Sequence, residues 1–248
     1  MLPYRDFYYP LNVFMHILTA EEGDVPYLHY GLFNDADESL PAAQERSTEL
    51  LLSKLPAPPA RLLEAGIGLA TTLARLTAMG YDVEGLTPDD KQIAVARARH
   101  GDALRIQCVK FEEFAGTGTY DAVIFQESSQ YIPAEALFAR AAALTRRVLV
   151  LDEFAVQPEG VLHRYDEFVE AAARHGFRIV EEVDLTEQAA PTIDYFNVRY
   201  PRHRERLIED LALSGQQVDE LIEGGFKYRQ LYRDKVFAYR FLDLRRER

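Results

Sequence analysis

The fold is decided by the stretch Arg61-Leu62-Leu63-Glu64-Ala65-Gly66-Ile67-Gly68-Leu69-Ala70-Thr71-Thr72. In it an apolar run ends in an acidic residue, two closely spaced glycines follow, and residues 71–79 then have the leucine and alanine spacing of a helix. This order predicts a strand, a tight turn and a helix start. Glycines permit positive φ and close approach of a ligand to the backbone. The N-terminus of a helix adds unpaired N–H groups and a partial positive charge.

The glycine pattern of this turn is degenerate. Ala70 stands where a dinucleotide-binding fingerprint would have its third glycine. Two interpretations therefore fit the stretch. It is either a nucleotide-type ligand site or an ordinary strand-to-helix turn whose glycines serve its geometry alone, and the rest of the chain has to decide.

Strands and helices alternate beyond this turn. Further strands are expected at 81–86, 104–109, 120–125, 147–151, 177–183 and 235–244, and helices at 41–54, 91–100, 134–144 and 163–175. Thr87 is expected to cap a helix whose first residue is Pro88. Such alternation predicts βαβ units and a parallel sheet with helices on both faces. We therefore expect an α/β fold with a doubly wound, mostly parallel sheet of seven strands.

Two segments stand outside the alternation. Residues 1–55 are rich in Tyr, Phe and His, and we expect short helices and loops that either pack outside the core or cover a ligand pocket as a lid. Residues 185–232 carry Pro191 and Pro201, with polar helices expected at 202–213 and 218–223. They predict a cap-like insertion before the last strand. The length of 248 residues fits one large domain that contains both segments.

The composition limits the partners and the compartment. The 28 basic and 40 acidic residues give a formal charge of −12, which disfavours nucleic acid and anionic membrane surfaces as partners. Cys108 lies in an apolar run and is expected to be a buried thiol. The stretch from Met1 to Asp6 lacks the features of a signal peptide, and no apolar run is long enough to span a membrane. We expect a cytoplasmic protein, for which a homodimer stays open.

The informative residues are those just after each expected strand, because open parallel sheets bind ligands there. They are Glu64, Gly66 and Gly68 after the first strand, Thr87 and Gln92 after the second, Phe111 and Glu112 after the third, and Gln126-Glu127-Ser128-Ser129-Gln130-Tyr131 after the fourth. Packing alone does not explain so many polar residues at strand ends. Their convergence favours a ligand site in one crevice.

These motifs resemble those of class I S-adenosylmethionine-dependent methyltransferases over residues 55–185. The run from Leu62 to Gly68 is similar to the first motif of the family, and the run from Tyr120 to Phe125 to its fourth-strand motif. Many members end the second strand with an acidic residue, whereas this chain has Thr87 there. Thr87 with Gln92 resembles the small-molecule branch that contains the cyclopropane synthases.

The resemblance implies a Rossmann-like methyltransferase fold, S-adenosyl-L-methionine as cofactor and S-adenosyl-L-homocysteine as product. It places Glu64, Gly66 and Gly68 at the methionine end of the cofactor and gives the ribose to Thr87 and Gln92. It further assigns Phe111 and Glu112 to the adenine, Gln126 to the cofactor side, and Tyr30 to an aromatic element that closes over the cofactor. A small-molecule acceptor in an enclosed pocket is expected.

Methyl transfer from a sulfonium is an in-line displacement that needs alignment and, for some acceptors, a general base. Glu127 and His29 are the candidate bases, with Tyr131 and Gln130 as positioning groups. Glu127 could equally be a supporting hydrogen-bonding acid, and His29 a packing histidine. Asp152 and Glu153 either line the substrate side or are exposed acids at a strand end.

Other chemistries find less support. The sequence has no HExxH motif, no paired cysteines and no clustered His/Asp set, so no metal site is expected. Ser128 and Ser129 lack the G-x-S-x-G pattern of a hydrolase. A nicotinamide-dependent oxidoreductase and a non-catalytic cofactor-binding homologue stay open as alternatives. The oxidoreductase would need a third glycine and an acid after the second strand, where this chain has Ala70 and Thr87.

Overall fold

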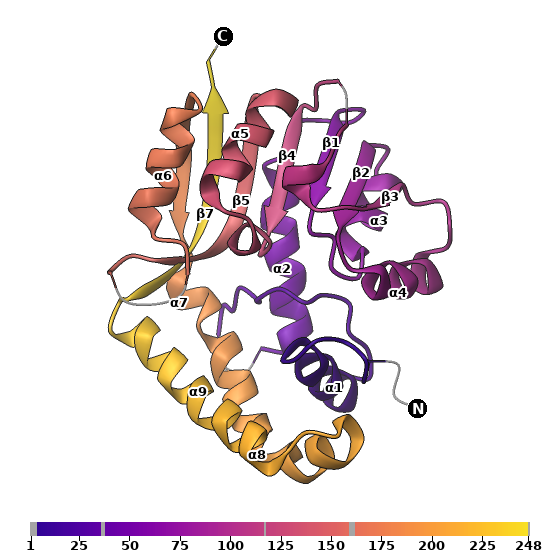
Figure 1. Ribbon diagram of the computed structural model, residues 1–248, viewed down its shortest axis with the longest axis vertical. Coiled ribbons are helices and arrows are strands. Elements are labelled where there is room, and N and C mark those ends of the chain that lie inside the picture. The colour runs from indigo at the N-terminus through magenta and orange to yellow at the C-terminus, as the bar shows by residue number, and fades with distance from the viewer. Residues whose placement is uncertain (1–3, 36–37, 117, 159–161, 248) are drawn as a thin grey trace. The chain divides into compact units, whose positions relative to one another are not determined.

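The apolar runs of the sequence form one sheet in the computed structural model, which describes residues 4–35, 38–116, 118–158 and 162–247. Within these residues seven strands lie in the order β3 (Ile106–Cys108), β2 (Asp82–Thr87), β1 (Arg61–Ala65), β4 (Ala122–Gln126), β5 (Arg147–Ala155), β7 (Phe237–Arg246) and β6 (Phe177–Asp184) (Figure 1). β7 is antiparallel to both of its neighbours, and the other pairs are parallel. The predicted mostly parallel α/β sheet is confirmed. Residues 1–3 of the N-terminal stretch lie outside the described part.

The chain divides into two units. One, here called the sheet unit, comprises Thr48–Thr186 and Val236–Arg248 and contains the sheet. The other, the helical unit, comprises Met1–Ser47 and Glu187–Lys235. The helical unit is thus assembled from the two segments that the sequence placed outside the strand–helix alternation.

Two helices cover one face of the sheet. α5 (Ala134–Leu144) and α6 (Tyr165–Arg174) lie in front of the strands in Figure 1. The ring of Phe138 on α5 lies 4.9 Å from that of Phe168 on α6 and 5.7 Å from that of Phe177 on β6. All three side chains are fully or almost fully buried. This aromatic cluster attaches both helices to the sheet.

The opposite face carries α3 (Thr71–Ala78), and the C-terminal part of α2 (Leu40–Ser53) extends into the sheet unit. The lack of a side chain at Gly85 lets α3 approach β2, because a Cβ there would lie 2.7 Å from a methyl group of Leu73. After α2, Lys54 forms an ion pair with Glu181 and lies over the ring of Phe241. α4 (Asp90–His100) follows β2 along the chain.

The helical unit consists of α1 (Leu11–Glu22), the N-terminal part of α2, α8 (Pro191–Leu211) and α9 (Gly215–Arg233), with α7 (Thr186–Ala189) at its border. α8 and α9 lie side by side at Gly225, whose carbonyl accepts a hydrogen bond of 3.1 Å from the Asn197 side chain (Figure 1). The polar helices predicted at 202–213 and 218–223 are too short, because the observed helices span Pro191–Leu211 and Gly215–Arg233. α8 begins at Pro191 and continues through Pro201, because buried residues on both sides of that proline hold the helix together.

Two local predictions are wrong. The N-cap of α4 is Asp89, whose carboxylate accepts hydrogen bonds from the Lys91 and Gln92 amides, whereas Thr87 is the last residue of β2. Asp accepts such bonds as well as Thr does, so the sequence pattern alone did not discriminate between the two. Cys108 is exposed and not buried, because its strand, β3, is the edge of the sheet and leaves one side uncovered.

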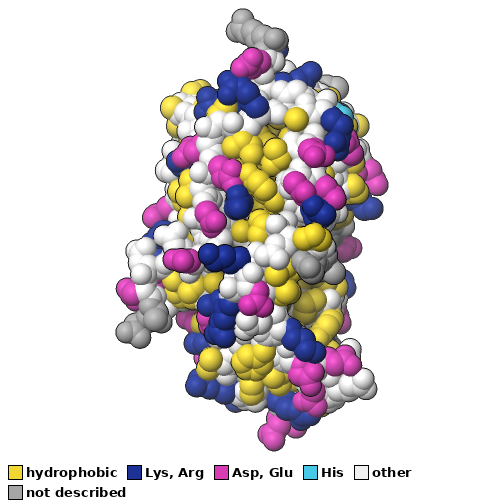
Figure 2. All heavy atoms as spheres, turned by 90° about the vertical axis from the view of Figure 1, so that its left-hand side faces the viewer, with side chains coloured by type: hydrophobic (Ala, Val, Ile, Leu, Met, Phe, Trp, Pro, Cys, Tyr) yellow, Lys and Arg dark blue, Asp and Glu magenta, His cyan; other side chains and the backbone are white. Residues whose placement is uncertain are grey.

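The surface shows no accumulation of one charge on the face drawn in Figure 2. Lys and Arg side chains alternate there with Asp and Glu, and several apolar patches lie between them. In the described residues no helix combines the length and apolarity that a membrane span requires.

The aromatic cluster yields a prediction for stability. Phe138→Ala removes a fully buried ring between two others and should lower the free energy of unfolding by about 3–5 kcal/mol. Phe226→Ala is the matched control, because the ring of Phe226 on α9 is exposed and its loss should change stability by less than about 0.5 kcal/mol. Urea titration followed by circular dichroism measures both, and similar costs for the two variants would contradict this packing.

Candidate functional site

Three of the predicted cofactor residues lie on one face of the sheet. Side chains alternate between faces along a strand. Their strand neighbours Ala65, Leu86 and Phe125 belong to the core under α5 and α6. Glu64, Thr87 and Gln126 therefore point to the other face, at the carboxyl ends of three adjacent strands, β1, β2 and β4. The sequence prediction that these residues converge is met by the sheet order.

Glu64 is buried without compensation. Its side chain is 2% exposed, and its Oε2 atom has no hydrogen-bond partner among the described residues. Burial raises the pKa of this carboxyl from 4.5 to about 8. A buried carboxyl group of this kind is well suited to receive a cationic or hydrogen-bond-donating ligand group.

The glycine turn after Glu64 is held from two sides. The amide of Gly66, which has a φ of 85°, donates a hydrogen bond of 2.8 Å to the carbonyl of Leu86. A Cβ on Gly66 would lie 2.3 Å from the Cβ of Ser128, whose hydroxyl donates to the carbonyl of Ala65. Gly68 and Ala70 continue the turn with φ of 50° and 63°. Ala70, which replaces the third glycine of the fingerprint, thus adopts the left-handed backbone conformation that glycine favours.

Thr87 and Gln92, which the resemblance assigns to the ribose, are in contact with each other. The Thr87 hydroxyl lies 3.0 Å from Gln92 Oε1 and also accepts a hydrogen bond of 3.2 Å from the Asp89 amide. Asp89 in turn caps α4 and so fixes the first turn, on which Gln92 lies. The pair presents one hydroxyl and one amide at the end of β2.

Gln126 belongs to a second polar contact at the end of β4. Its Oε1 accepts a hydrogen bond of 3.3 Å from the Thr72 hydroxyl on α3, and its Nε2 donates one of 3.4 Å to Thr48 on α2. All three residues are buried. Neither Thr72 nor Thr48 was predicted as a site residue, because each has the sequence context of an ordinary residue in an amphipathic helix.

Phe111 and Glu112 lie in a short 3-10 turn, η1 (Phe111–Glu113). The Phe111 ring packs edge-on against Phe125 at 5.0 Å in the core under α5, where it is 3% exposed. Its ring therefore serves core packing. Glu112 is partly exposed and is the more accessible of the two.

The loop after β4 carries Glu127 in a left-handed conformation, with φ of 53°. Its amide still donates to the carbonyl of Leu151 at 2.8 Å, which continues the strand pairing. Its Oε1 accepts a hydrogen bond of 2.6 Å from the hydroxyl of Tyr239 on β7. Tyr131, the other predicted catalytic residue of this loop, lies in η2 (Ser129–Tyr131) with its side chain 75% exposed.

The same loop is anchored by Asp152, which is buried and not an exposed acid. Asp152 Oδ2 accepts hydrogen bonds from the Ser129 amide at 2.9 Å and the Ser129 hydroxyl at 2.6 Å. Burial raises the pKa of Asp152 to about 6, which those hydrogen bonds oppose. His163 Nε2 approaches the carbonyls of Ser129 and Ile132 at 3.0 and 2.9 Å, and its backbone amide donates to Gln130 Oε1. The loop is thereby rigidly held.

His29 and Tyr30 belong to the helical unit. His29 Nδ1 lies 2.9 Å from the Tyr30 carbonyl and therefore carries the proton of that bond, since a carbonyl only accepts. Burial lowers the pKa of His29 to about 4, which leaves the ring neutral near pH 7 and makes it a weak base. A ring held neutral by burial does not support the predicted role of His29 as a general base.

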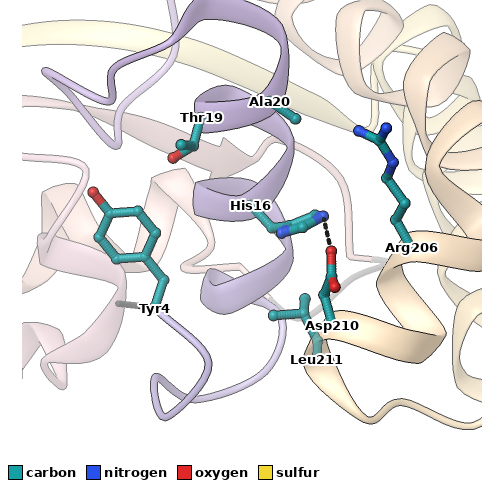
Figure 3. Close-up of a pocket in the computed structure, with 7 residues that line it drawn as sticks. All are labelled: Tyr4, His16, Thr19, Ala20, Arg206, Asp210 and Leu211. Atoms are coloured by element: carbon teal, nitrogen blue, oxygen red, sulfur yellow. Dashed lines mark ion pairs between the residues drawn. The ribbon is translucent and has the colours of Figure 1, made fainter. Parts of the chain in front are cut away.

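The helical unit also contains a pocket of about 190 Å³ beside α1 and α8 (Figure 3). It is lined by Tyr4, His16, Thr19, Ala20, Arg206, Asp210 and Leu211. The imidazole of His16 points to the Asp210 carboxylate at 3.6 Å, and burial is the main cause that lowers the pKa of His16. None of the residues predicted from the sequence line this pocket. Across the described ranges no group of three or more His, Cys, Asp or Glu side chains is arranged to hold a metal ion.

Comparisons with known proteins bear on the fold. No family model matches the chain, and no curated protein matches its sequence. Solved structures do match. The (4+2)-cyclase SpnF has a TM-score of 0.79 at 18% identity, over 93% of this chain and 91% of that one. A cyclopropane synthase from Mycobacterium tuberculosis has a TM-score of 0.77 at 19% identity, over 89% and 90%.

A geranyl diphosphate C-methyltransferase from Streptomyces coelicolor, solved with S-adenosyl-L-homocysteine, has a TM-score of 0.71 at 18% identity, over 98% of this chain and 95% of that one. The chain therefore has the Rossmann-like fold of class I methyltransferases, including the cyclopropane synthases, as the resemblance implied. A fold of this kind hosts more than one reaction, as the cyclase shows.

The buried Glu64 predicts a specific pH dependence of stability. Its pKa is about 8 in the folded protein and about 4.5 when unfolded, so the unfolded state binds fewer protons between these values. Its contribution to stability is complete below pH 4.5, falls as the pH rises, and is lost above pH 8. Glu64→Gln should reduce this decline, whereas Glu223→Gln, an exposed acid on α9, should leave it unchanged. Urea midpoints measured across this range test the assignment, and identical slopes for wild type and Glu64→Gln would refute it.

Proposed function

We propose that this protein is an S-adenosyl-L-methionine-dependent methyltransferase that acts on a small-molecule acceptor. The observation that carries the proposal is the buried Glu64 carboxyl, whose Oε2 has no hydrogen-bond partner in the described part of the chain. It lies beside the Gly66 turn, on the same face of the sheet as Thr87 and Gln126. Structural neighbours solved with S-adenosyl-L-homocysteine or S-adenosylmethionine support it.

Two chemical groups of the cofactor, the ammonium and the ribose, each have a matching partner among these residues. The methionine end carries an ammonium group, which matches the buried carboxyl of Glu64, and the turn at Gly66 gives room for that end. Thr87 and Gln92 offer a hydroxyl and an amide for the ribose hydroxyls. When bound, the cofactor supplies an activated methyl group. The chain's own residues have to hold the acceptor in line with it and exclude water.

A small acceptor fits the neighbours, which include enzymes for sarcosine and dimethylglycine and for geranyl diphosphate. Glu127 is proposed as the proton acceptor, because its carboxylate lies at the end of β4 next to Gln126. The roles of Tyr30 at the cofactor, of His29 and Tyr131 at the acceptor, and of Glu112 at the adenine rest on the sequence alone. So do the cytoplasmic location and the absence of a nucleic-acid partner, and a homodimer stays open.

The oxidoreductase alternative finds less support in the site. A nicotinamide dinucleotide needs an acid on the ribose at the end of β2, where Thr87 lies, and its pyrophosphate would approach the buried carboxyl of Glu64. The cyclase among the neighbours is a reason to measure methyl transfer itself and not only cofactor binding.

Titration calorimetry with S-adenosyl-L-homocysteine tests the cofactor assignment. We expect the wild type to bind it and not NAD. Gly66→Ala should abolish binding, because the new Cβ would lie 2.3 Å from Ser128 in a turn with φ of 85°. Gly80→Ala is the matched control, since Gly80 has a φ of 88° but no atom within 4 Å of the new Cβ. Absence of S-adenosyl-L-homocysteine binding in the wild type would overturn the proposed function.

A second measurement uses the protonation of Glu64. With a pKa of about 8, Glu64 is mostly protonated near pH 7, and a bound ammonium would favour its ionised form. Binding of S-adenosyl-L-homocysteine at about pH 7 should therefore release close to one proton. Calorimetry in buffers of different ionisation enthalpy measures this release, which Glu64→Gln should remove. Binding without proton release would place the ammonium away from Glu64.

A further inference from the structure

The backbone of Glu127 departs from the extended conformation of the preceding strand, β4. Phe125 lies on the α5 face and Gln126 on the opposite face, so a regular strand would return Glu127 to the α5 face. Instead its backbone turns left-handed at φ of 53°, a conformation that a residue other than glycine rarely adopts. The Glu127 carboxylate then meets the hydroxyl of Tyr239 at 2.6 Å.

Tyr239 lies on the same face as the predicted cofactor residues. It pairs with Glu153 in the β5–β7 register, and side chains opposite each other in an antiparallel pair share a face. Phe154, next to Glu153 on β5, and Leu242, three residues after Tyr239 on β7, belong to the α5 core. Glu153 and Tyr239 therefore point to the other face, which carries Glu64 and Gln126. The turn at Glu127 thus redirects its carboxylate to the cofactor face.

Tyr239 is itself buried and held by hydrogen bonds of its backbone. Its side chain is 0% exposed, its amide donates to the Thr186 hydroxyl at 3.0 Å, and its carbonyl accepts from the Leu185 amide at 2.8 Å. A buried phenol needs a hydrogen-bond partner, which by itself would explain the contact. It does not explain why the partner is a carboxylate brought across β5 by a strained backbone.

We propose that Tyr239 is a positioning residue that holds the Glu127 carboxylate toward the acceptor, and that the acceptor bears a transferable proton on oxygen or nitrogen. This rests on the proposed function. The acceptor's lone pair forms the new bond to the methyl carbon, the carbon–sulfur bond breaks with its electron pair left on sulfur, and the acceptor's proton passes to Glu127. The carboxylate of Glu153 on the same face further disfavours anionic acceptors.

The geometry can be tested on the protein alone by NMR of tyrosine labelled with ¹³C at Cζ. The resonance missing in Tyr239→Phe belongs to Tyr239, and Glu127→Gln should shift it. Glu84→Gln is the matched control, because Glu84 accepts a hydrogen bond of 2.8 Å from Tyr120 and its loss should move the Tyr120 resonance instead. A Tyr239 resonance unmoved by Glu127→Gln would overturn the proposal.

The functional consequence is tested with methyl-labelled cofactor and a panel of phenols, alcohols, amines and alkenes. Tyr239→Phe should bind S-adenosyl-L-homocysteine like the wild type, lower kcat about ten- to a hundredfold, and move the acidic limb of the kcat/KM profile to higher pH, because a bond donated to the ionised carboxylate is lost. Tyr165→Phe is the matched control, because it removes a similar phenol–carboxylate bond of 2.6 Å, to Glu182. It should leave the binding of S-adenosyl-L-homocysteine, kcat and the pH profile unchanged.

The outcomes separate the two proposals. Loss of S-adenosyl-L-homocysteine binding in Tyr239→Phe would assign Tyr239 to the cofactor site and overturn its positioning role. An unchanged kcat and pH profile, or transfer to alkenes only, would overturn it as well. Failure of the wild type to bind S-adenosyl-L-homocysteine would instead overturn the proposed function.

Discussion

The close approach of Gly66 to Ser128 governs the architecture of the site. The parallel pairing of β1 with β4 brings the turn after one strand against the loop after the other. At this point the two backbones come so near that only a hydrogen atom fits on Gly66, since a Cβ would lie 2.3 Å from that of Ser128. The Ser128 hydroxyl completes the contact with a hydrogen bond to the carbonyl of Ala65. The turn after β1 and the loop after β4 are therefore placed by one another.

The loop after β4 is also held by Asp152 of β5 and by His163. Asp152 binds Ser129 twice, and His163 approaches two carbonyls of the same loop. The two bonds of Asp152 are buried in surroundings of low dielectric constant, where each satisfied hydrogen bond is strong and each unsatisfied one costly. The one buried carboxyl oxygen of the site left without a partner in the described residues is that of Glu64. A rigid frame around an unsatisfied acid is the arrangement expected of a preorganised binding site.

The sequence predicted the features that depend on local pattern. The glycine turn and the order of strands and helices both follow from periodicity or from spacing within a few residues. The bond between Tyr239 and Glu127 joins residues 112 positions apart, and no periodicity encodes such a contact. The continuation of α8 through Pro201 and the exposure of Cys108 were mispredicted for a related reason. Both depend on which neighbours cover a segment, and this is a property of the tertiary structure.

The ends of the segment between β6 and β7 are tied together within the sheet unit. The Leu185 amide donates to the Tyr239 carbonyl, and the Thr186 hydroxyl accepts from the Tyr239 amide. Because hydrogen bonds within the sheet unit hold the two ends of the segment between β6 and β7 together, its length and sequence can change at small entropic cost. Evolution could therefore exchange α8 and α9 as a module while the strand ends with Glu64 and Thr87 stay intact.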